Sequence, residues 1–275
     1  MERMQMHQQD SITEEDWAYY LSFNPIKLIQ NTIDSLRNEN RFFVDERFLK
    51  LLYHFAFDPG SRVVSQLFIY PFDNRVFYRA RKYEKNDAEE RHSNPNAYGL
   101  FQGYDAENSF VPPVGTVSEG RINPANIRYL YTCSDEKTSI LETRIQPGEY
   151  VSIAKIKLRD EVHLVDFSKN YSIIDAENEE KTNWINFFVL GLAGVFQKPY
   201  VDNGSYYFCQ YVSEYLKNWG FDGIAFRSSM AQVDFGTVGV NYTFFNYEKC
   251  EVVSSKLYHV IGMEVETSPT LEGQK

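Results

Sequence analysis

Residues 120–167 read GRINPANIRYLYTCSDEKTSILETRIQPGEYVSIAKIKLRDEVHLVDF, and they indicate the fold class more clearly than any other part of the chain. Branched and aromatic residues gather in three runs typical of β-strands, and Ser134-Asp135 has the residue types of a helix N-cap. Strands mixed with helices, without regular alternation, indicate an α+β fold. The stretch predicts a turn, a strand, a short helix and two more strands, over residues 120–124, 127–133, 135–145, 150–158 and 162–167.

The flanking sequence extends this pattern in both directions. Four more segments rich in branched and aromatic residues predict strands, at 75–81, 223–227, 240–247 and 251–260. One helix is clear between them, because apolar residues from Phe208 to Trp219 recur every three or four positions. Gly220 follows where a helix C-cap is expected. We therefore expect a mixed β core with helices over residues 73–262.

Residues 1–72 predict a helical N-terminal region packed on this core. Ser11 with Glu14 fits a capping box, and Asn24-Pro25 fits a cap followed by a proline at the first helical position. A third helix is expected from Asp45, with the turn Asp58-Pro59-Gly60 ending it. Elsewhere, residues 81–113 are polar and turn-rich, which predicts a long loop or lid. Residues 263–275 predict a flexible tail.

The composition is that of an acidic globular protein. The 275 residues carry a formal net charge of −10, which disfavours bulk nucleic-acid binding. Three cysteines cannot all pair and none lies in a CxxC motif, which suits a reducing compartment. The first residues have no apolar core like that of a signal peptide. The longest apolar stretch, residues 185–196, is far shorter than the roughly 20 residues of a membrane span. We expect a cytoplasmic protein with no membrane contact.

Common cofactor and metal motifs are missing from the sequence. No GxGxxG follows a predicted strand, and no phosphate-binding GxxxxGK[ST], HExxH or metal-type Cys/His cluster occurs. The five histidines are scattered singly, and a lone histidine is far more often a surface or core residue than a ligand. We therefore expect neither a bound metal nor a required cofactor.

Three polar residues on or near predicted strands are candidates for a site. Arg79 lies on the strand 75–81, Arg121 lies in the turn before the strand 127–133, and Tyr131 lies on that strand. The pattern alone leaves simpler interpretations open: a surface arginine, a turn arginine and a core tyrosine.

Glu142 is the most informative candidate, because it lies one position round from the predicted inward stripe of its helix. That stripe consists of Thr138, Leu141 and Ile145. A carboxylate at the edge of a buried stripe can point into a cleft at the end of the preceding strand. A solvated glutamate paired with Arg144 would show the same pattern.

The order of these segments resembles the RES domain, a family named for its arginine, glutamate and serine. FYRAR, the Gly-Arg-x-Asn-Pro turn, the strand ending near a tyrosine and the helix with Glu142 are all similar to that family. Downstream, GFDGIAFRSSM resembles its serine block and matches the serine to Ser228, while Asn241 fits the strand after it. The resemblance covers roughly residues 73–260, about two-thirds of the chain. Ser229 adjoins Ser228, so the choice between them rests on register alone.

The resemblance implies an ADP-ribosyltransferase-like fold and an enzyme that consumes NAD⁺ by hydrolysis or phosphorolysis. Glu142 would stabilise the positive charge that forms on the ribose when nicotinamide leaves. Arg79 and Arg121 would bind the pyrophosphate, and in a phosphorolytic enzyme one of them would hold the attacking phosphate. Tyr131 would stack on nicotinamide or position Glu142. Ser228 would bind phosphate or ribose, and we do not assign it as a nucleophile because no histidine lies at a motif position to activate it.

NAD⁺, inorganic phosphate and an antitoxin or immunity protein are the partners that this resemblance implies, with growth inhibition as the cellular outcome. Two departures put the antitoxin in doubt: the helical N-terminal region is extra, and 86 positions separate Glu142 from Ser228 because residues 184–196 are inserted. Two alternatives stay open. The chain could transfer ADP-ribose to a protein or nucleic acid, or it could bind a nucleotide or partner without catalysis.

Overall fold

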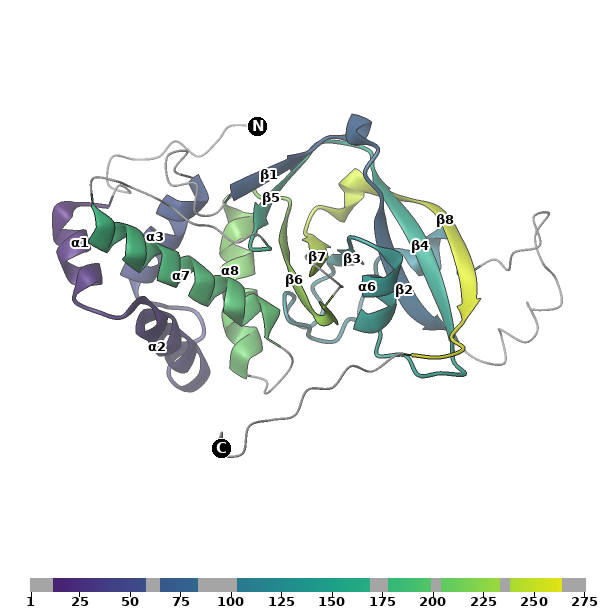
Figure 1. Ribbon diagram of the computed structural model, residues 1–275, viewed down its shortest axis with the longest axis horizontal. Coiled ribbons are helices and arrows are strands. Elements are labelled where there is room, and N and C mark those ends of the chain that lie inside the picture. Colours follow the sequence, from purple (N-terminus) through teal and green to yellow (C-terminus); the bar gives the residue numbers. More distant parts are fainter. Residues whose placement is uncertain are drawn as a thin grey trace.

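A mixed sheet of eight strands forms the centre of the computed structural model, which describes residues 12–57, 65–83, 103–168, 178–198, 204–232 and 238–263. The strand order is β1-β5-β6-β7-β3-β2-β4-β8, and every pair is antiparallel except β5 with β6 (Figure 1). The strands are β1 (Ser65–Ile69), β2 (Phe77–Tyr83), β3 (Leu130–Cys133), β4 (Tyr150–Leu158), β5 (Val162–Asp166), β6 (Gly223–Gln232), β7 (Val238–Phe244) and β8 (Cys250–His259).

Helices accompany the sheet without alternating regularly with its strands, so the α+β prediction is confirmed. They are α1 (Glu14–Leu21), α2 (Pro25–Asn38), α3 (Glu46–Phe57), α5 (Ala106–Ser109), α6 (Glu136–Glu142), α7 (Glu179–Gln197) and α8 (Gly204–Asn218). Two short 3-10 turns, η2 (Pro71–Asp73) and η4 (Tyr247–Lys249), complete the described elements.

β1 is the main difference from the sequence prediction. Its five residues lie within the stretch predicted to be helical, yet they pair antiparallel with β5 from Ser65–Asp166 to Ile69–Val162. Five residues are too few for periodicity to separate a strand from a helix, so the open edge of β5 decides the outcome. The boundary at residue 72 does not coincide with the start of the sheet, and the division into domains stays a prediction.

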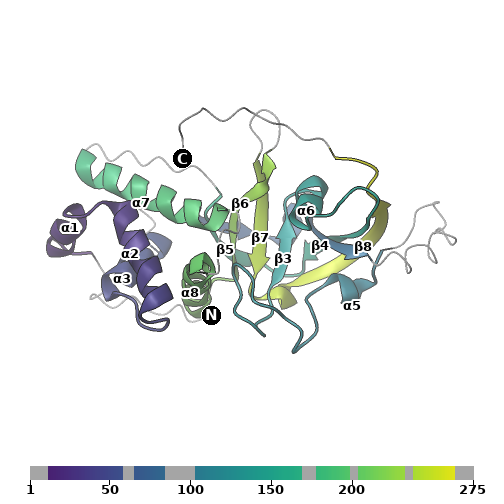
Figure 2. The ribbon, with the colours of Figure 1, turned by 90° about the horizontal axis from the view of Figure 1, so that it is seen from below.

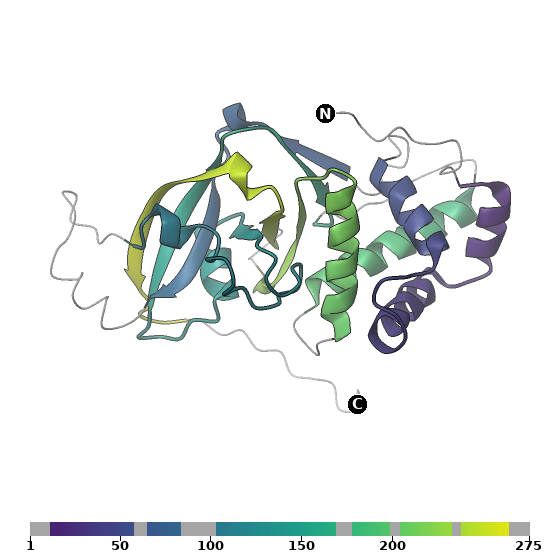
Figure 3. The same ribbon diagram turned by 180° about the vertical axis from the view of Figure 1, so that it is seen from behind.

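Helices α1, α2 and α3 pack against α7 and α8 at one end of the sheet (Figures 1 and 2). In Figure 3, α8 stands between the sheet and the N-terminal helices. Aromatic rings from α3, α7 and α8 meet in one apolar core. The ring centroid of Phe48 in α3 lies 6.1 Å from that of Phe188 in α7 and 5.5 Å from that of Phe208 in α8. The same core includes Val165 of β5 and Phe226 of β6. The N-terminal helices therefore share a core with the sheet domain.

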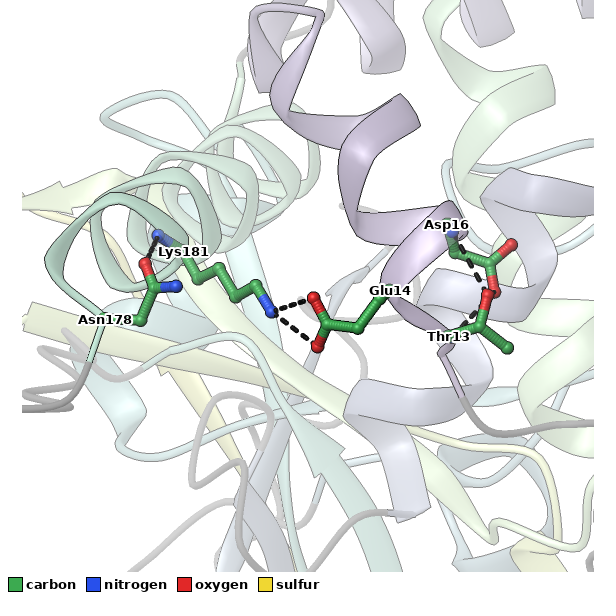
Figure 4. Close-up of polar contacts among 5 residues, drawn as sticks. All are labelled: Thr13, Glu14, Asp16, Asn178 and Lys181. Carbon is green, nitrogen blue, oxygen red and sulfur yellow. Dashed lines mark hydrogen bonds and ion pairs between the residues drawn. The ribbon is translucent and has the colours of Figure 1, made fainter.

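The start of α1 corrects one predicted cap. Thr13 is the N-cap, and it forms the capping box with Asp16, whereas Ser11 lies outside the described residues and Glu14 is the first helical residue (Figure 4). The Glu14 carboxylate instead accepts hydrogen bonds from Lys181 Nζ at 2.9 and 3.0 Å, which joins α1 to the first turn of α7 (Figure 4). The capping-box pattern cannot distinguish Ser11 from Thr13, because each is followed by an acidic residue three positions later.

Other predicted helix ends agree with the structure. Asn24 caps α2 through its side chain, with Pro25 at the first helical position, and Gly220 follows α8 with a φ of +93°. Asp45 precedes α3 and accepts a hydrogen bond from Arg47 N. The turn at residues 58–60, most of the predicted lid (84–102) and the tail from 264 lie outside the described residues.

The segment between β5 and β6, which the resemblance predicts to be an insertion, contains α7, a helix of 19 residues. Trp184 Nε1 donates a hydrogen bond to Phe23 O at 2.8 Å, which fixes α7 to the end of α1. Within the described part of the chain, no helix is both long and apolar enough to cross a membrane.

Helix α6 has a different position from the other helices, because it contacts β2, β3, β4 and β6. The sheet curves round it in Figures 1 and 2. Asp135 is its N-cap and accepts a hydrogen bond from Thr138 N at 2.7 Å, as predicted. Thr138 and Ile145 are buried, while Leu141 is only partly so. The C-terminal end of α6 therefore lies over the middle strands of the sheet.

Candidate active site

Four neighbouring strands and the end of α6 bring the predicted site residues together. In the order of the sheet, β6 carries Ser228, β7 carries Asn241, β3 carries Tyr131 and β2 carries Arg79. Glu142 is the last residue of α6. The helix that covers this face of the sheet thus ends at the point where these side chains gather.

The carboxylate of Glu142 is held by two neutral donors. Its Oε1 accepts a hydrogen bond from Ser228 Oγ at 2.7 Å and another from Asn241 Nδ2 at 2.7 Å. Among the described residues, no hydrogen bond or ion pair to Oε2 is present. One oxygen therefore fixes the orientation of the carboxylate, and neither donor neutralises its charge.

Ser228 makes this contact, and no such bond from Ser229 is present among the described residues; the choice of Ser228 over Ser229 as the functional serine stays a prediction. Regular pairing of β6 with β7 extends to Arg227–Val240 and then shifts, so Ser228 is the first residue of an irregular segment. Such irregularities re-aim side chains. The Ser228 side chain is buried, and its Oγ also accepts a hydrogen bond from Met230 N at 3.0 Å.

Arg79 is a partly buried cation with few partners. Its Nη1 donates to Tyr131 O at 3.1 Å, whereas Nε is buried without a hydrogen-bond partner among the described residues. Burial, reinforced by the nearby charge of Arg81, lowers the pKa of Arg79 to about 10. No carboxylate of the described residues forms an ion pair with it. A guanidinium in this position is suited to an anion that arrives from solution.

Arg121 is held by its surroundings in a similar way. Its Nη1 donates to Phe196 O, the last turn of α7, and its guanidinium carbon lies 5.8 Å from the centre of the Phe226 ring. Within the described residues it has no acidic partner either. Helix α7 thus touches the site through the carbonyl that orients Arg121.

The turn that carries Arg121 is fixed from both sides. Tyr131 Oη donates to Asn123 Oδ1 at 2.6 Å and accepts from Ile122 N at 3.1 Å. Gln210 of α8 donates to Gly120 O at 2.8 Å. A Cβ at Gly120 would lie 2.5 Å from Asn123 Oδ1 and 3.0 Å from Tyr131 Oη, so a larger residue here would displace the hydrogen bond between Asn123 and Tyr131.

Burial raises the pKa of Tyr131, despite hydrogen bonds that favour the phenolate, so the hydroxyl stays protonated and acts as a donor. It is therefore a structural support of the turn.

Two cavities meet at Glu142. One, of about 430 Å³, is lined by Arg121, Tyr131, Glu142, Arg144, Tyr206, Phe226 and Asn241. The other, of about 280 Å³, is lined by Arg79, Tyr131, Glu142, Asn241 and residues of β2, β3 and α6. Arg79 and Arg121 thus approach Glu142 from different cavities. Ser228 lines neither cavity, and its part is to hold Glu142.

The sequence of this site region matches the RES domain over residues 77–260. The chain belongs to the RES domain family. No curated protein gives a significant match. Among solved structures, one match is the crystal structure of the M. tuberculosis MbcT–MbcA toxin–antitoxin complex, with 11% identity and a TM-score of 0.35 over 68% of this chain and 90% of that chain.

Several residues around the RES arginines, glutamate and serine were absent from the predicted site set. Asn241 was assigned only to a strand, although Asn in a β-rich run is an unusual choice that signals a specific hydrogen bond. Cys133 donates to Asn241 Oδ1 at 3.2 Å, and burial raises its pKa well above the usual value, so this thiol is not a nucleophile at neutral pH. Gln210 reaches the site through tertiary packing, which leaves no local signal in the sequence, whereas Arg144 lies two positions after Glu142 and was considered only as its ion-pair partner.

Metal chemistry has no candidate ligands in the part of the chain that the structure describes, where no group of three or more His, Cys, Asp or Glu could hold an ion.

Proposed function

We propose that this RES protein is an NAD⁺-degrading enzyme that cleaves the bond between nicotinamide and ribose. The position of Glu142 is the main support for this proposal. Ser228 and Asn241 orient its carboxylate through one oxygen, and the residue borders two cavities that are each lined by at least one arginine. A fixed anion beside two cationic sites suits a substrate that carries two phosphates at its centre and develops positive charge on the ribose towards one end.

The chemistry explains the need for a single carboxylate. When the C–N bond breaks, its electron pair leaves with nicotinamide, which becomes neutral, and positive charge develops on the ribose. An oriented carboxylate stabilises that charge more in the transition state than in the ground state, which is the condition for faster turnover. An oxygen of water or inorganic phosphate then bonds to the anomeric carbon, and an attacking water loses a proton to solvent.

The arginines supply the charge that the substrate's phosphates require. The chain as a whole has a net charge of −10, so arginines without an acidic partner in the described structure mark this region as locally favourable to anions. Arg121 lines the larger cavity and Arg79 the smaller one. In a phosphorolytic reaction Arg79 would hold the attacking phosphate, and in a hydrolytic one both arginines would bind the substrate.

The decisive experiment is product analysis. Purified protein is incubated with NAD⁺, with and without inorganic phosphate, and the products are identified by mass spectrometry. Nicotinamide with ADP-ribose indicates hydrolysis, nicotinamide with ADP-ribose phosphate indicates phosphorolysis, and a mass increase on an added protein or nucleic acid indicates transfer. If NAD⁺ stays intact under all conditions, the proposal is wrong.

In cells, this activity would deplete NAD⁺ and arrest growth, so we propose that the chain acts as a toxin under the control of a partner protein. Growth of an inducible strain, with NAD⁺ measured at intervals after induction, tests this part separately.

A further inference from the structure

Arg144 adopts a backbone conformation that favours glycine. It follows the C-cap Thr143 of α6, its φ is +51°, and its N–H bonds to Leu141 O at 3.0 Å. Glycine is usual at this position and asparagine is the common substitute. Among the described residues, the other non-glycine residues with positive φ are indeed asparagines, Asn74 and Asn126. An arginine here makes the fold less stable than glycine would.

The side chain of Arg144 lines the larger cavity together with Arg121 and Glu142. Arg144 is exposed, and no hydrogen bond or ion pair to its guanidinium is present among the described residues. A cation near a helix C-terminus interacts favourably with the helix dipole, but position 143 would offer that interaction in ordinary helical geometry. The dipole alone therefore does not account for an arginine in the left-handed conformation.

We propose that Arg144 and Arg121 form a clamp for the two phosphates of a dinucleotide, so that the site selects NAD⁺ over nicotinamide mononucleotide. The inference rests on the proposed function and specifies its substrate class. Arg121 uses Nη1 to bond Phe196 O, which leaves other N–H groups of its planar guanidinium available. A diphosphate offers oxygens for both arginines, whereas a mononucleotide has one phosphate and satisfies only one of them. A cavity of about 430 Å³ lies within the usual size of small-molecule sites.

The test is the substitution Arg144→Gly, which removes the guanidinium and also removes the strain of a non-glycine residue at positive φ. NAD⁺ and nicotinamide mononucleotide contain the same bond to be cleaved, so nicotinamide release gives kcat/KM for each. For NAD⁺, kcat/KM should fall on the order of 10-fold or more, through KM, because a charge-assisted hydrogen bond is lost. The value for the mononucleotide should fall much less, because Arg121 remains to bind its single phosphate. The melting temperature should rise.

Asn126→Gly is the matched control. Asn126 has a φ of +69°, is exposed and lies outside the cavity lining. This variant should also be at least as stable as the wild type, but its preference for NAD⁺ over the mononucleotide should not change. An Arg144→Gly protein that is more stable and retains the wild-type preference would overturn the clamp.

Equilibrium binding separates this proposal from the proposed function. The clamp requires ADP to bind the wild type more tightly than AMP, and Arg144→Gly to remove that difference, whether or not NAD⁺ is cleaved. Equal affinities of ADP and AMP for the wild type would refute the clamp even in a protein that destroys NAD⁺.

Discussion

The carboxylate of Glu142 is held in place by two hydrogen bonds from uncharged donors. Ser228 and Asn241 orient it through hydrogen bonds without a positive charge, and arginines line both cavities that it borders. A bound substrate would bring its own developing positive charge into the space between them. The carboxylate is thus preorganised for a charge that appears only during the reaction.

The substitution Glu142→Gln tests the charge alone. A glutamine can still accept hydrogen bonds from Ser228 and Asn241 through its carbonyl oxygen, so the shape of the site is retained. We expect kcat to fall on the order of 100-fold or more, while KM for NAD⁺ changes little. Nicotinamide release measures both constants. Glu180→Gln, an exposed change in the first turn of α7, is the control and should behave as wild type. Wild-type turnover in Glu142→Gln would remove this residue from the mechanism.

Two adjacent serines give a matched test of how Glu142 is held. Ser228 bonds Glu142 Oε1, whereas Ser229 has no such bond. Ser228→Ala should lower kcat about 10-fold, because the carboxylate keeps only one of its two donors. Ser229→Ala should leave kcat unchanged. A steady-state assay of both variants at saturating NAD⁺ decides the matter, and equal losses in the two would mean that the effect is structural.

At the scale of elements, the first turn of α1 shows how capping and tertiary contacts combine. Asp16 closes the capping box with Thr13 and also bonds Lys50 of α3 at 2.5 Å (Figure 4 shows the cap). Burial raises the pKa of Asp16, but the hydrogen bonds from Lys50 and Thr13 outweigh it and lower the pKa to about 2. Its ionised form is therefore favoured in the folded state.

The substitution Asp16→Asn should destabilise the protein in a pH-dependent way. Because the folded-state pKa lies below the ordinary value of 3.8, the stabilisation is present above pH 3.8 and is lost as the pH falls towards 2. Urea unfolding at neutral pH should show a loss of about 1 kcal/mol, and the difference from wild type should shrink across that acidic window. Glu14→Gln, at an 87% exposed side chain in the same turn, is the control and should cost less. A pH-independent difference would contradict this role of the charge.

Periodicity and cap chemistry were sufficient for most elements, and they failed where tertiary contacts decide. The strand at residues 150–158 and the cap at Asn24 follow from local residue types. Branched and aromatic residues favour strands in most proteins, and asparagine favours helix N-caps in the same general way. β1 could not be predicted, since its partner β5 follows about 100 residues later in the sequence. The N-cap of the first helix was predicted at Ser11, two positions before Thr13, because both residues carry a hydroxyl and have an acidic residue three positions later.

In the candidate site, too, local sequence patterns predicted some residues and tertiary contacts determine the others. The edge position of Glu142 on its helix follows from the apolar stripe, and the link to Ser228 came from the resemblance to the RES domain. Asn241 and Gln210 reach the site only after the sheet has formed, whereas Arg144 lies two positions after Glu142 in the sequence. The arrangement of the arginines around the two cavities is also a property of the folded chain.

For the whole molecule, the shared core predicts that the helical and sheet parts unfold together. Phe188 is fully buried in α7, with its ring centroid 6.1 Å from that of Phe48 and 5.5 Å from that of Phe55. Phe188→Ala should lower the free energy of unfolding by about 3–5 kcal/mol. Helical circular dichroism and Trp fluorescence should show one coincident transition in wild type and variant.

The neighbouring phenylalanine provides the control for this experiment. Phe187 is 58% exposed, so Phe187→Ala should change the free energy of unfolding by less than about 0.5 kcal/mol. Two separate transitions in the wild type would contradict a single cooperative core.

The packing of α7 on the N-terminal helices also constrains how this chain could have arisen. Without α1, α2 and α3, the buried side of α7 around Phe188 and Trp184 would face water; without α7, the N-terminal helices would lose the surface that Phe48 and Phe55 cover. Each of the two segments thus depends on the other to cover its apolar side chains. Insertions so dependent on each other are expected to be gained and lost as a pair, so RES relatives that carry the helix between β5 and β6 should also carry the N-terminal helices, and relatives without one should lack both.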